Sequence, residues 1–575
     1  MSKKNIGILV AAILLIIAIV VGVFIVPRDV EEVVEVAEEP VEEPAEEPVE
    51  EVGLYTPIGT FPIVTEPITM SVFITQPPTV EDYETNLETL WMEEKTGIHI
   101  DWMTVPGEGA AERVTLMLAA GDLPEVFMAP GVMTNDMIIR FGIEADMFLP
   151  LDDLIETHMV NFPKHMEEHD FIKGAITAID GNIYAIPGWN DCFHCQYAMK
   201  FWMNHDWLEI LGLEPPETTE ELYQVLKAFR DNDPNRNGIA DEIPLTGTPG
   251  SWHTGVVNFI MNAFIFDSGM GEPTHRFLNV TEQRVDTIVN KDQYREGLKF
   301  LNRLYKEGLI YPPSFTQSLD ELRSLAAAGI VGSAPGGFAG LWFDMVTQND
   351  LYRQFNVIAP LEGPDGVRQA TWYKYQPIQS NAFIMTKAAK HPEAFIRWAD
   401  YRLSRENFLE IETEIGRMGP PQPGDIGIDG EPATHRELIP WPTEIQNVHW
   451  AQAGIIFLTS DYRLSQAADP GVDRHSALGL ESLLFETSRD LMQPFTSEDY
   501  AVLPLLMHTV EEIEEISILV TELERYIDEA ELKFITGEMD INSDSAWQQH
   551  VDALDAIGLP RYLELRQIAY DRQFR

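Results

Sequence analysis

The sequence predicts an α/β protein with two lobes, preceded by a membrane-spanning helix and an acidic linker. The chain has 575 residues, of which 45% are hydrophobic, and a single core rarely grows beyond roughly 250–300 residues. At least two lobes are therefore expected. From Pro67 onward, short apolar strands alternate with amphipathic helices. This alternation is typical of a parallel sheet with right-handed helical crossovers.

The first 28 residues are a candidate membrane anchor. The segment 6–26 contains 21 residues without a charge, which at ~1.5 Å per residue is enough to cross a hydrocarbon core of roughly 30 Å. Two lysines precede it, so the positive-inside rule places everything after Arg28 outside the cell. No cleavage site of small residues stands before Pro27. We therefore predict that residues 1–28 form an uncleaved anchor, with a removed signal sequence as the alternative.

Residues 29–66 are predicted to form an acidic linker rich in proline and glutamate. Between Asp29 and Gly53 there are 12 acidic residues and no basic residue. Like charges repel one another, and proline lacks the amide hydrogen that a helix requires. The linker should act as an extended tether that holds the folded part off the membrane.

The charge of the chain restricts its partners. The formal net charge is −54, so a phosphate backbone would be repelled and nucleic acid is excluded as a partner. The same repulsion disfavours anionic lipid surfaces. It also favours solubility, and we expect a monomer.

The first elements after Pro67 follow one another closely. The stretch ITMSVFIT (68–75) predicts a strand, and YETNLETLWMEEKTG (83–97) predicts a helix that ends at a glycine. IHIDWMTV (98–105) predicts a second strand because its apolar residues alternate. GAAERVTLMLAAGDLPEVFMAP (109–130) adds a helix, a glycine stop and a third strand.

A long amphipathic helix is predicted near the C-terminus. Thr509 followed by Glu512 is a capping-box signature that marks its start. Isoleucines and leucines then recur at helical spacing. We interpret this apolar face as core packing rather than as a binding surface.

Six blocks of the sequence resemble bacterial extracellular solute-binding proteins. LMLAAGDLPEVFMAP, followed by MFLPLDDLIETH, resembles the first lobe of that family, and DGNIYAIPGWN (180–190) resembles the strand that crosses between lobes. The segment 201–245 resembles the start of the second lobe, and 382–404 the return to the first. AELKFITGEMD and IGLPRYLELRQIAYDRQ resemble the C-terminal helices of the lipoprotein, saccharide-associated branch. The blocks occur in the family's order over most of residues 67–575.

The resemblance implies a periplasmic-binding-protein type II-like fold, in which two α/β lobes close on a ligand about a hinge. The chain should cross between the lobes near residues 190–196, 374–378 and 414–420. Lobe I is expected to comprise residues 67–190 plus 378–416, and lobe II residues 196–375 plus 420–575.

The function that this resemblance implies is that of a receptor for an ABC importer. Such a receptor captures a small solute, here an oligosaccharide or a related compound, by closing its lobes outside the cell. Its partners would be the transmembrane subunits of the permease. The protein would be tethered to the cell membrane through its N-terminal helix, or secreted.

The stretch DNDPNRNGIADEIPL (231–245) predicts a structural calcium site. Asp233, Asn235, Asn237 and Asp241 occupy positions 1, 3, 5 and 9 of an EF-hand-like loop. Alternate residues of such a loop point inward and offer several oxygens to one hard cation at ~2.4 Å. Gly238, at position 6, allows the sharp turn.

The end of this loop departs from the EF-hand pattern. Position 12 is Pro244 instead of glutamate, and Glu242 at position 10 is the nearest replacement. This departure resembles the calcium loop of alginate-binding members of the family, which is closed by an adjacent Asp–Glu pair. The alternative is a metal-free surface turn. The predicted Ca²⁺ ligands are Asp233, Asn235, Asn237, Ile239 through its carbonyl, Asp241 and Glu242.

The two cysteines, Cys192 and Cys195, leave two interpretations open. Outside the cell a local disulfide is plausible, with a pair of free thiols as the alternative. The motif HMEEH (165–169) matches the H-x-x-E-H pattern of inverted zinc proteases. No third ligand from a distant segment stands out, so we interpret HMEEH as part of a solvated surface helix.

No catalytic residues are predicted. The sequence lacks the nucleophile-elbow, phosphate-loop and dinucleotide signatures. A pair of carboxylates for glycoside hydrolysis could be hidden among 93 acidic residues. A surface glycan-degrading enzyme is therefore the alternative to a receptor, and a receptor for a peptide or another solute on the same fold is a further one.

Aromatic residues gather in segments that the resemblance places at the cleft between the lobes. A sugar ring has apolar C–H faces and a polar rim, so a saccharide site needs flat aromatic side chains together with amides or charges. The candidate ligand-binding residues are Trp189, Asn190, Asp191, Trp252, Phe338, Trp342, Trp372, Tyr375, Arg417 and Trp450.

Overall fold

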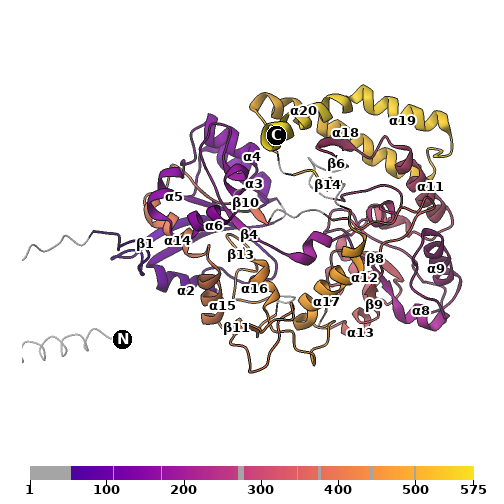
Figure 1. Ribbon diagram of the computed structural model, residues 1–575, viewed down its shortest axis with the longest axis horizontal. Coiled ribbons are helices and arrows are strands. Elements are labelled where there is room, and N and C mark those ends of the chain that lie inside the picture. Colours follow the sequence, from indigo (N-terminus) through magenta and orange to yellow (C-terminus); the bar gives the residue numbers. More distant parts are fainter. Residues whose placement is uncertain are drawn as a thin grey trace, which may run out of the picture. The chain divides into compact units, whose positions relative to one another are not determined.

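A computed structural model describes most of the chain from residue 53 onward (Figure 1). The described ranges are 53–107, 109–169, 171–269, 277–345, 347–372, 377–440, 445–497, 500–504 and 506–575. The predicted anchor over residues 1–28 and the linker as far as residue 52 lie outside them. No helix within these ranges combines the length and apolar character that a bilayer crossing requires. Residues 53–575 form one compact unit.

A six-stranded sheet is built from both early and late segments of the chain. Its strand order is β13-β4-β10-β3-β1-β2. The strands β1, β2 and β3 are mutually parallel as predicted, β10 is antiparallel to β3 and β4, and β13 is parallel to β4. The strands span Ile68–Gln76 (β1), Ile98–Pro106 (β2), Val126–Met128 (β3), Ile186–Asn190 (β4), Ile378–Met385 (β10) and Phe457–Leu458 (β13).

The two predicted crossover helices connect the parallel strands. Helix α2 (Leu87–Thr96) starts at the side chain of Asn86, which accepts a hydrogen bond from a backbone amide of the first turn, and ends at Gly97. Helix α3 (Ala110–Ala120) ends at Gly121. Both glycines adopt left-handed backbone angles, with φ of 76° and 70°, a conformation that favours glycine. The sequence prediction is confirmed for this part of the fold.

The folded part begins earlier than predicted. Residues 53–66 were expected to belong to the linker, but Tyr55 and Val64 form a β-bridge and Ile63 and Val64 are buried. The guanidinium of Arg397 donates a hydrogen bond of 2.9 Å to the carbonyl of Thr56. This segment contains prolines and no regular apolar period, so its burial could not be read from local sequence.

One later segment also lies where the predicted lobe boundaries did not place it. Residues 420–575 were assigned to lobe II, yet β13 pairs with β4, and Trp450 and Tyr462 belong to the same apolar core as β1 and β2. A strand of two residues is too short to give a pattern in the sequence. The division into two lobes otherwise stays a prediction.

The rest of the chain forms two small sheets surrounded by helices. One sheet has the order β8-β5-β9 and the other β14-β6-β7. Helix α18 begins at the predicted capping box, with Thr509 and Glu512 bonded reciprocally to each other's backbone, and lies beside α11, α19 and α20 (Figure 1). The strands span Ser333–Pro335 (β8), Phe201–Asn204 (β5), Phe355–Val357 (β9), Tyr500–Val502 (β14), Leu278–Thr281 (β6) and Arg284–Thr287 (β7), and these helices Asp292–Lys306 (α11), Val510–Thr536 (α18), Asp544–Ile557 (α19) and Leu559–Phe574 (α20).

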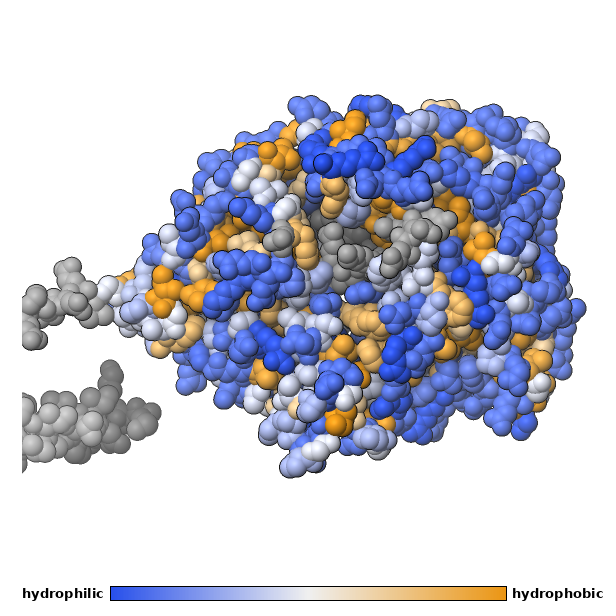
Figure 2. Space-filling view, in the orientation of Figure 1, coloured by the Kyte–Doolittle hydropathy of each residue, from blue (hydrophilic) through white to orange (hydrophobic). Residues whose placement is uncertain are grey.

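Shorter helices cover the sheets and carry much of the site described below. The visible surface is largely hydrophilic (Figure 2), as expected for a strongly acidic chain. The shorter helices are α4 (Asn135–Met137), α5 (Asp152–His158), α6 (Asn161–Glu168), α7 (Phe171–Ile176), α8 (His205–Leu211), α9 (Thr219–Asp231), α10 (Asn258–Met261), α12 (Leu319–Ala327), α13 (Asn349–Tyr352), α14 (Pro392–Tyr401), α15 (Arg405–Glu414), α16 (Ser460–Leu464) and α17 (Leu480–Thr487). In addition, a short ladder joins β11 (Met418–Gly419) and β12 (Arg436–Glu437).

Candidate functional site

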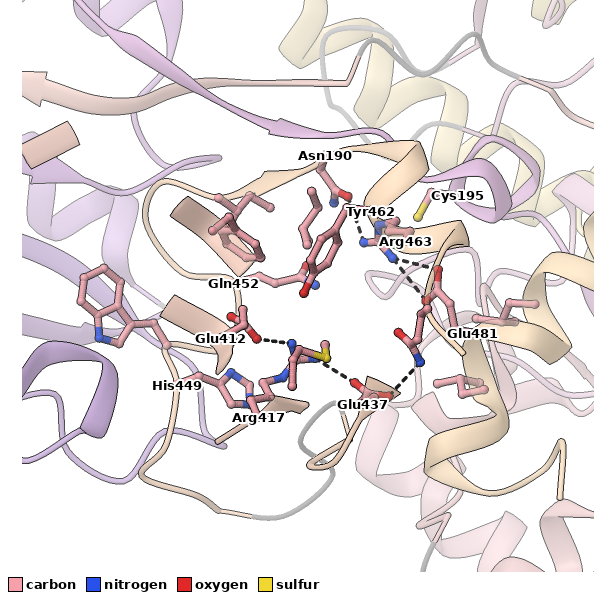
Figure 3. Close-up of a pocket in the computed structure, with 18 of the residues that line it drawn as sticks. Asn190, Cys195, Glu412, Arg417, Glu437, His449, Gln452, Tyr462, Arg463 and Glu481 are labelled. Atoms are coloured by element: carbon pink, nitrogen blue, oxygen red, sulfur yellow. Dashed lines mark hydrogen bonds and ion pairs between the residues drawn. The ribbon is translucent and has the colours of Figure 1, made fainter. Parts of the chain in front are cut away.

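A pocket of about 260 Å³ lies at the ends of β4 and β13 (Figure 3). One part of its wall comes from the core of the six-stranded sheet and includes Asn190 and Trp450. Another part comes from the region of the β8-β5-β9 sheet and includes Phe338 and Leu480. The pocket is therefore lined by segments that are far apart in the sequence.

Arg417 is held between two carboxylates at the pocket wall (Figure 3). Its guanidinium forms an ion pair with Glu412, at the end of α15, and a second with Glu437 of β12 at 2.9 Å. All three side chains are at most 10% exposed. A buried cation with two anionic partners is fixed in position, and the group as a whole places negative charge beside the pocket.

Burial changes the protonation of Glu437. It raises the pKa of this carboxyl to about 7, although Arg417 acts in the opposite direction. The amide of Gln466 also donates a hydrogen bond of 3.3 Å to Glu437. Glu437 therefore changes its charge near neutral pH.

This titration predicts a pH effect on stability. Because the folded pKa of Glu437 is raised above the ordinary value of 4.5, its contribution to stability is full at low pH and is lost as the pH rises through about 7. The wild-type protein should lose about 1–3 kcal/mol relative to Glu437→Gln between mildly acidic and mildly alkaline pH, since one pKa unit corresponds to ~1.4 kcal/mol. Urea unfolding of both proteins at the two pH values measures this difference. A constant difference would contradict the assignment.

Arg463 connects β4 to α17 across the pocket (Figure 3). Its guanidinium pairs with Glu481 at 3.0 Å and donates a hydrogen bond of 2.9 Å to the side-chain oxygen of Asn190. His194 lies 3.4 Å from the same carboxylate, and burial lowers the pKa of His194 to about 4. Asn190, a predicted ligand residue, thus presents its amide group to the pocket in a fixed orientation.

Two aromatic side chains form a further part of the wall. Trp252 is 37% exposed, and its ring centre lies 6.4 Å from that of Phe338. A Cβ atom on Gly337 would come within 2.1 Å of the Trp252 ring, so only glycine lets the indole lie against this backbone. Trp450 also lines the pocket but is almost fully buried, with Arg402 stacked on it at 4.3 Å.

The predicted ligand residues therefore divide into three groups. Asn190, Trp252, Phe338, Arg417 and Trp450 line the pocket. Trp189, Asp191, Trp342 and Trp372 do not appear in its wall: Trp342 lies fully buried in a core, Trp189 packs against histidines, and the indole of Trp372 donates to Gln196 at 3.2 Å. Tyr375 lies outside the described residues.

Most of the charged residues of the site could not be identified from the sequence. Glu88, Arg402, Glu412, Glu437, Arg463 and Glu481 all line the pocket. No motif surrounds them, and their partners come from other segments. Only the structure identifies them among the many charged residues of the chain.

Cys192 and Cys195 form a disulfide. This settles the choice between a disulfide and free thiols that the sequence left open. Cys195 lies at the pocket wall, and the bridge closes a short turn directly after β4. The disulfide thereby restrains the chain next to Asn190.

The acidic loop after α9 is folded around its own side chains. The carboxylate of Asp233 accepts hydrogen bonds from the amides of Asn237 and Gly238 at 3.1 and 3.0 Å, and Gly238 has a φ of 78°. The side chain of Asn237 donates to Asp241 at 3.0 Å. The side chains at positions 1, 5 and 9 thus lie close together.

The buried carboxylate of Glu242 is not explained by the formation of a turn alone. Both of its carboxylate oxygens are buried, and no side chain of the described residues forms a hydrogen bond with them. Burial, and then the charges of Asp233 and Asp241, raise the pKa of Glu242. An unpaired buried carboxylate beside two others fits a site for a hard divalent cation.

Comparison with known proteins relates this architecture to a family. The sequence model described as bacterial extracellular solute-binding protein matches residues 76–407, more than half of the chain. The chain is also 26% identical over 527 residues to the fructooligosaccharide ABC transporter substrate-binding protein FusA of Streptococcus pneumoniae serotype 4 (strain ATCC BAA-334 / TIGR4). The aligned region covers 89% of this chain and 92% of the relative.

Solved structures show the same fold. The complex of S. pneumoniae FusA with kestose has a TM-score of 0.72 at 24% identity, and the complex of a FusA EF-hand mutant with fructo-nystose has a TM-score of 0.71 at 23% identity. The HMO-binding solute-binding protein of Bifidobacterium longum infantis ATCC 15697 has a TM-score of 0.66 at 18% identity. Each match covers 88% of this chain and 99% of the other. The family match and the shared fold agree, and the protein belongs to the family of bacterial extracellular solute-binding proteins.

Proposed function

We propose that this protein is the extracellular receptor of an ABC importer and that its cargo is an oligosaccharide. The observation that carries the proposal is the pocket itself. Trp252 and Phe338 offer flat apolar surfaces to the faces of sugar rings, and Asn190, Arg417 and Glu437 offer hydrogen-bonding groups to hydroxyls. The family membership and the name of the S. pneumoniae relative support the same class of cargo.

The proposed mechanism is closure of two lobes on the sugar, within the type II-like arrangement predicted from sequence. Arg463 of α16 and Glu481 of α17 meet at the pocket. Their neighbours Tyr462 and Leu480 belong to different apolar cores. A bond that joins the two sides of a cleft favours the closed state. The transmembrane subunits of the permease would recognise that state.

Direct binding tests the proposal. Kestose, the sugar in the FusA complex, is titrated into the full-length protein by calorimetry. Trp252→Ala should weaken the binding by about 10–100-fold, as expected for an aromatic side chain at the centre of a contact. Phe574→Ala serves as the control because Phe574 is also an exposed aromatic residue, in the last helix and outside the pocket wall.

The outcomes of this experiment test the identity of the cargo and the location of its site. If kestose and longer oligosaccharides all fail to bind to the wild-type protein, a peptide or another solute becomes the cargo. Equal binding to wild type and to Trp252→Ala would remove the pocket as the sugar site. Neither result would affect the family assignment.

The proposed receptor binds its cargo without cleaving it. Glu88, Glu412, Glu437 and Glu481 all line the pocket, so a glycan-degrading enzyme would have its acidic residues here. Prolonged incubation with the bound oligosaccharide, followed by chromatography, distinguishes the two. Released mono- or disaccharides that disappear in Glu437→Gln would establish a glycan-degrading enzyme instead.

The loop 233–242 is proposed to hold a structural Ca²⁺. The ligands would be the side chains of Asp233, Asn235, Asn237, Asp241 and Glu242 and the carbonyl of Ile239. The unpaired buried carboxylate of Glu242 supports this proposal, as does the existence of an EF-hand in FusA, which its mutant structure names. The ion would fix the loop that follows α9, without contact to the pocket lining.

The location of the protein is proposed from its family and its N-terminal sequence. The family is extracellular, and the apolar segment 6–26 is long enough for a bilayer. Tethering through residues 1–28 therefore stays a prediction, with secretion as the alternative. Separation of membranes from medium after expression distinguishes the two.

A further inference from the structure

Three potential metal ligands converge at the end of α6. They are His165, Glu168 and His169, and one nitrogen or oxygen atom of each lies within 4.8 Å of the other two. The ring centres of the histidines are 4.9 Å apart. These residues belong to the HMEEH motif, which we expected on a solvated helix. That prediction is wrong for His165, which is only 7% exposed.

His165 places one of its ring nitrogens in a buried position. Its ring packs edge-on against Trp189 at 4.2 Å and against Phe457 at 4.9 Å. Among the residues that the structure describes, its Nε2 atom has no hydrogen-bond partner. Such an atom destabilises the fold when it stays unsatisfied. Native proteins rarely keep one without a ligand or a function for it.

The aromatic surroundings fix the orientation of the His165 ring. The ring packs against Trp189 and Phe457, so little freedom remains to be lost when a ligand binds. Metals bind imidazole through the lone pair of a ring nitrogen.

The other two residues open the cluster to solvent. His169 is half-buried and stacks on the face of Trp189 at 4.6 Å, whereas Glu168 is exposed. A cation can therefore reach the cluster from the side of Glu168.

We propose that His165, Glu168 and His169 bind a divalent transition metal of the zinc class. Two imidazoles and one carboxylate are a common set of three protein ligands for Zn²⁺, and water fills the remaining position. Imidazole ligands favour Zn²⁺, Ni²⁺ or Cu²⁺, whereas Ca²⁺ and Mg²⁺ prefer oxygen. The site is thus chemically distinct from the loop 233–242. It does not depend on the proposed cargo.

The consequence of binding would be local. A metal on both histidines would fix the rings that enclose Trp189, and Trp189 is followed directly by Asn190 of the pocket. The metal would therefore stiffen the end of β4. No chemistry on a substrate is implied.

The test is a calorimetric titration of the full-length protein with Zn²⁺, in buffer with saturating Ca²⁺ so that the acidic loop is occupied. The wild-type protein should bind one Zn²⁺ at this site. His169→Ala and Glu168→Gln should each weaken it by at least ~10-fold, the smallest loss typical of disturbed metal sites. Glu167→Gln, an exposed neighbour on the same helix, and His158→Ala of α5 should match the wild type.

His165→Ala is a weaker test because it opens space beneath Trp189 and can disturb folding. The test therefore depends on His169→Ala and Glu168→Gln, which change the two more exposed residues. The melting temperatures of these variants without metal should equal that of the wild type. Co²⁺ substitution adds a visible absorption band that reports the ligand geometry. Absence of binding, or equal binding by His169→Ala and Glu168→Gln, would overturn the proposal.

Discussion

Replacement of Arg402 by methionine is expected to lower the free energy of unfolding by about 3–5 kcal/mol, because it leaves a buried carboxylate without its counter-charge. Arg402 and Glu88 form an ion pair of 2.7 Å in which the side chains are only 2% and 4% exposed. Burial raises the pKa of Glu88, and Arg402 acts against that effect. Arg402 also donates to the carbonyl of Ile455 and stacks on Trp450.

A surface pair provides the control for this variant. Arg405 pairs with Asp461 at 2.8 Å, but these side chains are 30% and 66% exposed. Arg405→Met should therefore cost less than about 1 kcal/mol. Urea unfolding followed by tryptophan fluorescence measures both losses, and equal losses would show that burial of the Arg402 pair is not the cause.

A second variant separates the charge from the packing of Arg402. Glu88→Gln in the Arg402→Met background removes the unpaired carboxylate but leaves the other lost contacts unchanged. Part of the stability should return, since replacing both partners of a buried pair costs less than replacing one. No recovery would mean that the contacts to Ile455 and Trp450 account for the whole loss.

Removal of Ca²⁺ is expected to destabilise the protein by about 2.7 kcal/mol at a free concentration 100 times the dissociation constant. The effect should depend on Glu242. In the absence of the ion, this buried carboxyl lies beside Asp233 and Asp241, whose charges raise its pKa together with burial. With the ion, the same charges would become ligands.

Glu242→Gln should therefore have opposite effects in the two conditions. In excess Ca²⁺ the variant should melt at a lower temperature than the wild type, because it has lost a charged ligand. In excess chelator it should be at least as stable as the wild type, because the repulsion is gone. Glu538→Gln, at an exposed position after α18, is the matched control. A wild-type melting temperature that does not respond to chelation would remove the calcium site.

Local patterns were sufficient to predict much of the fold. The order of β1, α2, β2, α3 and β3 follows from alternating and helical periods, and Gly97 and Gly121 mark the helix ends because each helix stops at a left-handed backbone angle there. The capping box of α18 is equally local, since Thr509 and Glu512 bond within one turn. These features need no knowledge of distant contacts.

The candidate site could be predicted only in part. Trp252 and Phe338 stand in glycine-rich loops, a context that favours a binding role over a core role, and both line the pocket. Trp189 is favoured on the same ground, but it does not line the pocket. Trp342 lies in a similar segment but is fully buried. The two cases differ in which partner segment covers the indole ring, and the sequence near each tryptophan does not contain that information.

The sequence by itself determined the α/β class, the family resemblance, the order of the first elements and the oxygen-rich loop 233–242, because each depends on residues close together in the chain. The tertiary structure alone decided which charges face the pocket, as in the pairs of Arg463 with Glu481 and of Arg402 with Glu88. Ion pairs and burial depend on distances through space, and in a chain with 93 acidic residues each basic group has many possible partners. The folded structure determines which of these partners each basic group contacts.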